Sequence, residues 1–306
     1  MTGAGGPDPR HRAAARLFPV FVSLLGMAPS AGAAPLLMWE AVGPRATVTM
    51  IGSIHVGQPD FFPLPAPYEQ ALAAAGVLAV EVDATSVANQ ARLAALVAER
   101  GSLPDSVTLR DRLTPATWSR LAIAAREHGL PIAAIERRQP GLVAMMLEMR
   151  AYVRQGFDPE LGIDKHFLEA AREQGKPVRE LESIDRQLDL FLDLDDQLDE
   201  ALIEQFLDEM GDLAGMTRRM VEAWQRGDAA ALEAMLQDPA GDDPRLTAWY
   251  RRVVDDRNVA MADSLDHWLR GDVDVCVVVG AGHFVGERGL VRLLGDRGWT
   301  VTRRQD

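Results

Sequence analysis

The sequence predicts an α/β protein with a central, mostly parallel or mixed sheet built from strands near both ends of the chain. Two apolar, β-branched runs, VTMI and VCVVV, are each followed by Gly-x-x-His and then by another glycine. Between them lie apolar residues at the spacing of amphipathic helices. We therefore expect one domain, residues 34–306, with a largely helical insertion at about 84–255.

Each element follows from the apolar spacing and from the residues that bound it. The segment before residue 46 is interpreted as a lead-in, and the first and last strands must lie side by side or close to it for the sheet to exist. The predicted strands are 46–54, 76–83, 131–136, 176–183, 274–279 and 299–304. The predicted helices are 67–75, 87–100, 115–128, 142–155, 163–174, a helical stretch over 185–236, 246–269 and 289–298.

The first 33 residues are typical of a secretory signal peptide. Three arginines precede a short apolar run, Leu17–Ala28, and an Ala-x-Ala site ends at Ala33. This apolar run is too short for a comfortable membrane span, and no other stretch approaches that length. We expect an exported protein, periplasmic or secreted, that has no stable membrane span once the signal is removed.

Composition argues against a nucleic-acid partner and excludes a metal site built on several cysteines. The net charge is −13, and no run of lysine and arginine appears beyond the N-terminus, which argues against a nucleic-acid partner. The single cysteine, Cys276, lies in a predicted core strand. An intramolecular disulfide and a metal site built on several thiolates are therefore excluded.

Ionisable side chains end five of the predicted strands. His55 and His283 follow the two glycine-containing strands, and three glutamates end others: Glu81, Glu136 and Glu182. The carboxyl ends of parallel strands share one edge, where ligands bind, and Gly52 and Gly280 allow close backbone approach there. Two imidazoles and one or two carboxylates suit a divalent cation, or a histidine base oriented by a carboxylate if no metal is present. By default Arg257 would be a surface helix residue.

An ordered set of motifs also resembles the TraB/GumN family. It comprises the two Gly-x-x-His frames, VEVD, GID at Gly162–Asp164, LESIDRQ, RN at Arg257–Asn258 and the closing GAGHFVGERGLVRLLGDRGWTV. The resemblance spans about residues 36–302. It implies a fold like that of erythromycin esterase and the haem-binding ChaN proteins, and metal-dependent proteolysis outside the cell.

The resemblance also implies roles for individual residues. His55 and His283 become metal ligands or catalytic groups, and Glu81 a ligand or general base. Arg257 becomes a candidate for binding a substrate carboxylate or an oxyanion. Glu182 becomes a further ligand or, with Asn258, a supporting residue.

We therefore expect an exported hydrolase that cleaves a peptide or other acyl bond with a divalent metal ion such as manganese, cobalt or zinc. One alternative is a metal-free esterase that uses His55 as its base. Another is a non-catalytic binding protein for haem or another small ligand.

Overall fold

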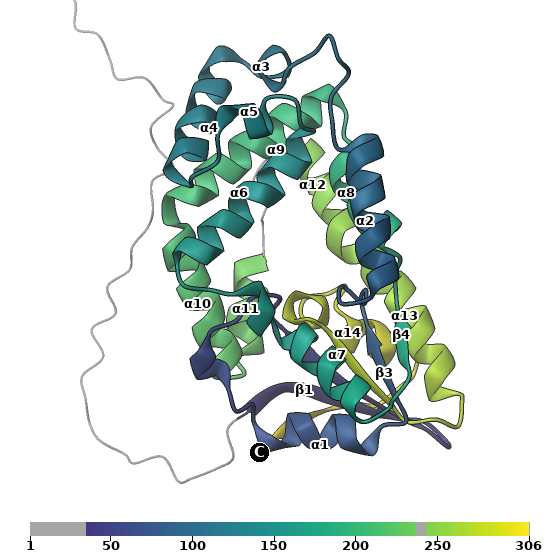
Figure 1. Cartoon of the computed structure of the whole chain (residues 1–306). Coiled ribbons are helices and arrows are strands. Elements are labelled where there is room, and N and C mark those ends of the chain that lie inside the picture. The colour runs from purple at the N-terminus through teal and green to yellow at the C-terminus, as the bar shows by residue number, and fades with distance from the viewer. Residues whose placement is uncertain (1–34, 237–242, 306) are drawn as a thin grey trace, which may run out of the picture. The chain divides into compact units, whose positions relative to one another are not determined.

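Six strands form one mixed sheet in the computed structural model, which describes residues 35–236 and 243–305 (Figure 1). The predicted α/β class is confirmed, whereas the expected signal peptide lies outside the described residues. Across the sheet the strands lie in the order β4-β3-β5-β2-β1-β6. Their bounds are Pro35–Val42 (β1), Thr47–Ser53 (β2), Val77–Val80 (β3), Val178–Glu180 (β4), Val275–Gly280 (β5) and Val301–Gln305 (β6).

The two strands that carry the Gly-x-x-His frames are neighbours. β2 and β5 pair in parallel, in a register that sets Val48 opposite Val275 and Ser53 opposite Gly280. β3 and β4 continue the parallel part of the sheet on the other side of β5. Residues 275–279 are all buried, as expected for a parallel strand with both faces covered. The carboxyl ends of the four parallel strands therefore meet at one edge.

The structure adds a strand, β1, where the sequence indicated only a lead-in. β1 contains Trp39 and pairs antiparallel with β2 and with β6, so the first and last strands of the sheet lie side by side. In the turn to β2 the Gly43 N–H donates to the Ala46 carbonyl at 2.8 Å. A Cβ atom on Gly43 would clash with the carbonyl oxygen of Leu269, so only glycine fits this turn. In the sequence, β1 closely follows the apolar run Leu17–Ala28, which hid the start of the strand.

One predicted strand is wrong, because residues 131–136 contain a short helix, α5 (Ile132–Ile135). An apolar run this short fits a strand or a buried helix equally well, and its two alanines favour the helix. Ile135 packs into a core cluster formed by helices. Glu136 directly follows α5, a helix that lies far from the strands in Figure 1, and so does not belong to the sheet edge.

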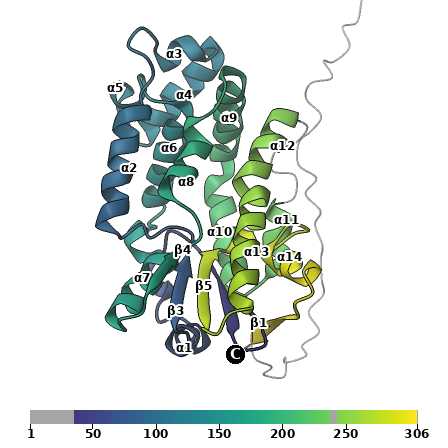
Figure 2. The same ribbon diagram turned by 90° about the vertical axis from the view of Figure 1, so that its right-hand side faces the viewer.

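The helices form two groups (Figures 1 and 2). α1, α7, α10, α11, α13 and α14 share the core of the sheet, whereas α2–α6, α8, α9 and α12 lie beyond the carboxyl ends of the strands and have core clusters of their own. Their bounds are Ala66–Ala74 (α1), Val87–Arg100 (α2), Leu109–Arg112 (α3), Pro115–Glu127 (α4), Pro140–Arg154 (α6), Ile163–Glu173 (α7), Ile184–Leu192 (α8), Asp196–Glu209 (α9), Leu213–Gln225 (α10), Ala229–Leu236 (α11), Pro244–Tyr250 (α12), Asp256–Leu269 (α13) and Leu290–Asp296 (α14).

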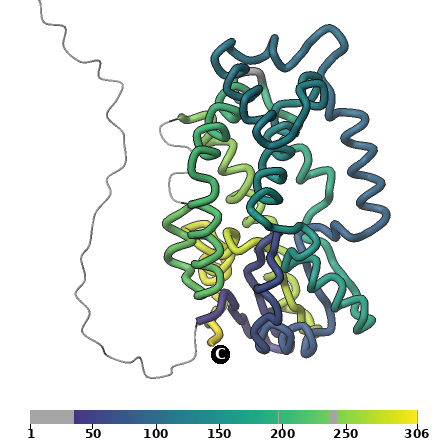
Figure 3. The backbone as a smooth tube through the Cα atoms, turned by 60° about the vertical axis from the view of Figure 1, so that its left-hand side comes forward, coloured from purple at the N-terminus to yellow at the C-terminus, as the bar shows by residue number. Residues whose placement is uncertain are grey.

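The helical segment between β3 and β5 is not continuous. The chain leaves the sheet after β3, returns to it at α7 and β4, and leaves it again through α8 (Figure 3). All described residues belong to one compact unit. In the part of the chain that the structure describes, no helix has both the length and the apolarity that crossing a membrane would need.

One carboxylate in the helical group is buried without adequate partners. The side chain of Asp199, on α9, is 2% exposed, and its nearest cation is Arg112, whose NH1 lies 3.9 Å from Oδ2. That oxygen accepts no hydrogen bond from the described residues. Burial raises the pKa of Asp199 from 3.8 to about 6, and Arg112 only partly opposes this. Folding therefore favours the protonated form of Asp199.

We expect Asp199→Asn to stabilise the protein at neutral pH. The raised pKa means that the carboxyl favours folding at pH values below 3.8 and that this contribution is lost as the pH rises through 6. The variant should raise the free energy of unfolding by on the order of 2 kcal/mol at pH 7–8, and by progressively less toward pH 4. Urea unfolding at several pH values measures this. Asp272→Asn, at an exposed position, is the control, and an equal gain at all pH values would contradict the argument.

Candidate active site at the carboxyl edge of the sheet

Four of the side chains singled out from the sequence lie together at the carboxyl edge of the sheet. His55 follows β2, Glu81 follows β3, and His283 lies in a 3₁₀ turn, Ala281–Phe284, directly after β5. Glu182 follows β4, beside the end of β3. Because these four strands are parallel neighbours, the side chains converge although more than two hundred residues separate the two histidines.

Both histidines approach the same carboxylate oxygen of Glu81. The distance from Oε1 to Nε2 is 3.9 Å for His55 and 3.6 Å for His283. The backbone N–H of Gly280 donates to this oxygen at 2.8 Å. The side chains of Glu81 and His283 are each 8% exposed, whereas that of His55 is 64% exposed. Solvent therefore reaches this centre from the side of His55.

The glycines of the two frames leave room where a side chain would interfere. A Cβ atom on Gly280 would lie 3.3 Å from Glu81 Oε1, 3.4 Å from His55 Nε2 and 3.7 Å from His283 Cδ2. Gly280 thus faces the space between the three side chains. At Gly52 a Cβ atom would come within 3.1 Å of Ala281, in the turn that carries His283. The glycine at position 280 therefore leaves space between the three side chains, and the glycine at position 52 allows close packing against Ala281.

Arg257 is buried and bound to two carboxylates, although its sequence context is that of a surface helix residue. Its Nε and NH2 donate to Glu182 at 2.9 and 2.6 Å, and NH2 also donates to Glu81 Oε2 at 2.5 Å. NH1 donates to the carbonyl of Val253, in the π-helical turn Arg251–Asp255 that precedes α13. These contacts balance charge within the centre and occupy both oxygens of Glu182, while the substrate-binding role expected for Arg257 stays a prediction.

Each histidine has a partner on Nδ1. His283 Nδ1 lies 2.6 Å from Asn258 Oδ1, and the Asn258 amide nitrogen donates to the Arg288 carbonyl at 2.9 Å. This second bond orients the Asn258 amide, so we assign the proton of His283 to Nδ1 and the lone pair to Nε2. His55 Nδ1 lies 2.8 Å from Asp164 Oδ2. Asn258 therefore supports His283, whereas the partner of His55 is a residue that the sequence indicated only as part of the GID motif.

The electrostatics give the three groups different charges at neutral pH. The carboxylate of Asp164 raises the pKa of His55 to about 10. Burial lowers the pKa of His283. Burial also acts to raise the pKa of Glu81, but His283, His55 and Arg257 outweigh it and lower that pKa to about 2. Glu81 is therefore ionised, His283 neutral and His55 positively charged when no other cation is bound.

Glu81 and the two histidines are spaced more widely than the ligands of a tetrahedral metal ion. Bonds from zinc to imidazole nitrogen or carboxylate oxygen are about 2.0–2.2 Å, so tetrahedral ligands lie about 3.4 Å apart. The separations of 3.6 and 3.9 Å between Glu81 and the two histidines exceed that by a few tenths of an ångström. Within residues 35–236 and 243–305, no group of three or more His, Cys, Asp or Glu side chains could hold a metal ion in the positions that the structure gives them.

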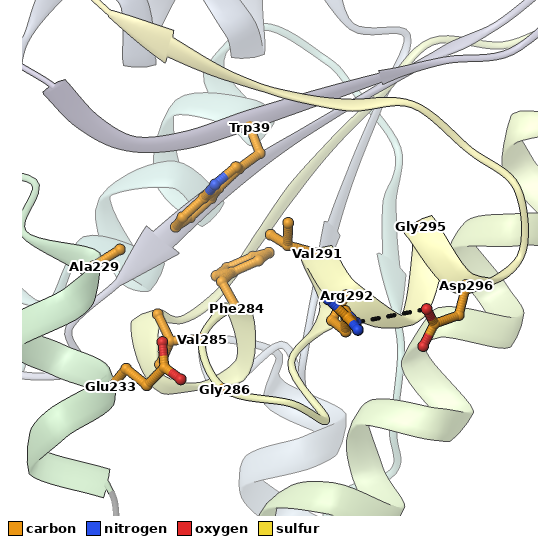
Figure 4. A pocket seen from close by; sticks show the side chains of 10 residues that line it. All are labelled: Trp39, Ala229, Glu233, Phe284, Val285, Gly286, Val291, Arg292, Gly295 and Asp296. Atoms are coloured by element: carbon orange, nitrogen blue, oxygen red, sulfur yellow. Dashed lines mark ion pairs between the residues drawn. The ribbon is translucent and has the colours of Figure 1, made fainter.

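A pocket of about 460 Å³ lies beside the turn that carries His283 (Figure 4). Phe284 lines it and stacks on Trp39, with the ring centroids 4.9 Å apart. Residues of α11 and α14 complete the lining, among them Arg292 and Asp296, which form an ion pair. The histidines and glutamates of the sheet edge do not line this pocket. We therefore place the candidate chemistry at the sheet edge and not here.

The fold and this centre define a class of protein: α/β proteins in which strands from both chain ends bring two Gly-x-x-His frames and a glutamate to one sheet edge. The chain belongs to the TraB/PrgY/gumN family, whose model matches residues 37–303. The resemblance predicted from the motifs is thereby confirmed.

Two similar proteins share most of their length with this chain. They are "Uncharacterized protein YbaP" of Escherichia coli (strain K12) and the protein of the same name from Shigella flexneri. Each is 28% identical over 245 residues, which cover 80% of this chain and 86% of the relative. No solved structure matches the chain.

We expect Gly280→Ala to fill the centre while leaving the fold intact. The backbone angles of Gly280, φ −49° and ψ 134°, suit any residue, but the added methyl group would lie 3.3 Å from Glu81 Oε1. Uptake of a divalent ion should fall by about tenfold or more, a loss of about 1.4 kcal/mol in binding free energy. Titration with Mn²⁺ measures it, and thermal unfolding checks the fold.

The matched control for this variant is Gly295→Ala. Gly295 lies in α14, where a Cβ atom would meet nothing within 4 Å. This control should bind as the wild type does. Wild-type affinity in Gly280→Ala would show that the space beside Gly280 is not the binding site.

Proposed function

We propose that the protein is a hydrolase whose His55, His283 and Glu81 bind one divalent cation and cleave a peptide or other acyl bond. The convergence of both Nε2 atoms on one oxygen of Glu81, at 3.9 and 3.6 Å, is the observation that carries the proposal. With both imidazoles neutral, the charged groups of the centre are three carboxylates and one guanidinium, a net charge of −2: Glu81, Asp164, Glu182 and Arg257. A divalent cation would neutralise that charge.

The ligands in this proposal are His55 Nε2, His283 Nε2 and Glu81 Oε1. The bound ion would lower the pKa of a water molecule and polarise the substrate carbonyl. Glu182 is left out of the ligand set because both of its oxygens bind Arg257. Arg257 and the Gly280 N–H keep Glu81 ionised and in place. The substrate enters past His55, the exposed member of the three.

The cellular location forms part of the proposal. We infer export to the periplasm or the medium from the signal-peptide pattern at the N-terminus. The substrate would then be an extracytoplasmic peptide or small acyl compound. Haem binding remains a prediction from the sequence, and a haem titration without a Soret shift would contradict it.

A metal-free hydrolase, with the pair formed by His55 and Asp164 as its acid–base group, is the second candidate. A general base must be unprotonated at the working pH. The pKa of His55, raised by Asp164 to about 10, leaves the ring protonated at neutral pH. Without a metal His55 is therefore suited to donate a proton and not to accept one, which makes this candidate the weaker of the two. A chelator abolishes activity only under the metal-dependent proposal.

We expect the purified protein to hold about one divalent ion per chain, because the centre offers one set of three ligands. His55→Ala, His283→Ala and Glu81→Gln should each lose most of it, since each removes a ligand or its charge. Elemental analysis after dialysis measures the content, and hydrolysis of a peptide library with added Mn²⁺ or Co²⁺ measures activity.

The control for these variants is His267→Ala, on the exposed surface of α13, which should bind and cleave as the wild type does. Circular dichroism confirms that all the variants fold. A wild-type protein that takes up no divalent ion and cleaves nothing in the library with Mn²⁺ or Co²⁺ would rule out the metal-dependent proposal.

A further inference from the structure

The start of α7 is fixed against the end of β2, although about 110 residues separate them in sequence. The Ile163 N–H donates to the Ile54 carbonyl at 2.9 Å. A Cβ atom on Gly162 would lie 2.5 Å from the carbonyl oxygen of His55, so the two segments are in close backbone contact. This contact places Asp164, in the first turn of α7, beside the first Gly-x-x-His frame.

Both carboxylate oxygens of Asp164 have a partner in that frame. Oδ2 lies 2.8 Å from His55 Nδ1, and Oδ1 accepts a hydrogen bond from Ser53 Oγ at 2.6 Å. Ser53 is 2% exposed, at the end of β2, so its hydroxyl is held by the sheet. The carboxylate cannot rotate without losing one of the two bonds. Asp164 therefore has a fixed orientation toward His55.

The two histidines depend on their partners to different degrees. The His283 side chain is 8% exposed, so packing alone restricts its ring. The His55 side chain is 64% exposed, so few packed atoms hold it. A charge-assisted hydrogen bond is stronger than a neutral one. The exposed ring is thus the one that binds a carboxylate, whereas the buried ring binds the neutral amide of Asn258.

We infer that Asp164 is a positioning residue, which holds the His55 ring with Nδ1–H toward α7 and Nε2 toward Glu81, and that Ser53 fixes the carboxylate of Asp164. This inference rests on the proposed function, because its consequence is that His55 Nε2 is presented to the bound cation. Removing such a partner of a ligating histidine lowers metal affinity by about 10–100-fold. The same role explains why a serine occupies the second position of the frame.

The first test observes the hydrogen bond itself, without metal. In the full-length protein labelled with ¹⁵N-histidine, His55 should give a low-field, slowly exchanging Hδ1 signal, assigned by its loss in His55→Gln. The signal should persist in Ser53→Ala and disappear in Asp164→Leu. Glu169→Ala, on the exposed side of α7, is the control and should leave it unchanged.

The second test uses Co²⁺ alone and a double-mutant cycle. In Asp164→Asn the Ser53 hydroxyl can accept from the amide nitrogen, which turns the amide oxygen toward His55. Ser53→Ala and Asp164→Asn should therefore each weaken Co²⁺ binding by less than about tenfold. The double variant should lose more than the two effects combined, and Asp164→Leu should lose about 10–100-fold. A residue that acted only through packing would show no such synergy.

The outcomes separate this inference from the proposed function. Wild type without Co²⁺ uptake, but with an Hδ1 signal that depends on Asp164, contradicts the proposed function and leaves the positioning role standing. An Hδ1 signal that survives in the folded Asp164→Leu variant, or in the double variant if Asp164→Leu does not fold, overturns the inference. So does strict additivity in the cycle.

Discussion

The parallel pairing of β2 with β5 is the interaction on which the rest of the structure depends. It joins segments more than two hundred residues apart, and closing so long a loop costs entropy that local contacts cannot offset. The valines of β5 supply the compensating burial. They point alternately to the two faces of the sheet, and both faces are covered, so all of them are removed from water. Neighbouring strands lie about 4.8 Å apart, so the register that sets Ser53 opposite Gly280 also brings both histidine frames to one place.

The two carboxylate oxygens of Glu81 have different partners. Oε1 faces Gly280 and the two imidazoles, while Oε2 accepts from Arg257 and from Gln187. A buried carboxylate is costly unless it is paired and hydrogen-bonded, and Arg257 meets that need while it also binds Glu182. Consecutive residues of α13 thus support different parts of the centre, because Arg257 holds the carboxylates and the next residue, an asparagine, holds His283.

The sequence predicted the strands that carry the histidines, because a β-branched run that ends in glycine has few other interpretations. Most helices were predicted to within a few residues, since their apolar spacing and caps are local signals. The role of Asp164 was not predicted. A carboxylate in the first turn of a helix is usually explained by the helix dipole, and nothing in the sequence indicates a partner about 110 residues away. The same limit applies to Arg257, whose burial depends on where β3 and β4 end.

The sheet edge carries His55, Glu81 and His283. Residues of the helices beyond it lie near His55, the exposed member of the three. Glu148, on α6, is one example: burial raises its pKa, Tyr152 donates to it at 3.0 Å, and the charge of His55 acts in the opposite direction. Glu148 therefore lies near enough to His55 for the two charges to interact. Under the proposed function a substrate passes His55, and helical residues such as Glu148 would contribute to selectivity. Under that proposal, variation in the helices would change the substrate while the sheet edge, and the chemistry with it, stays the same.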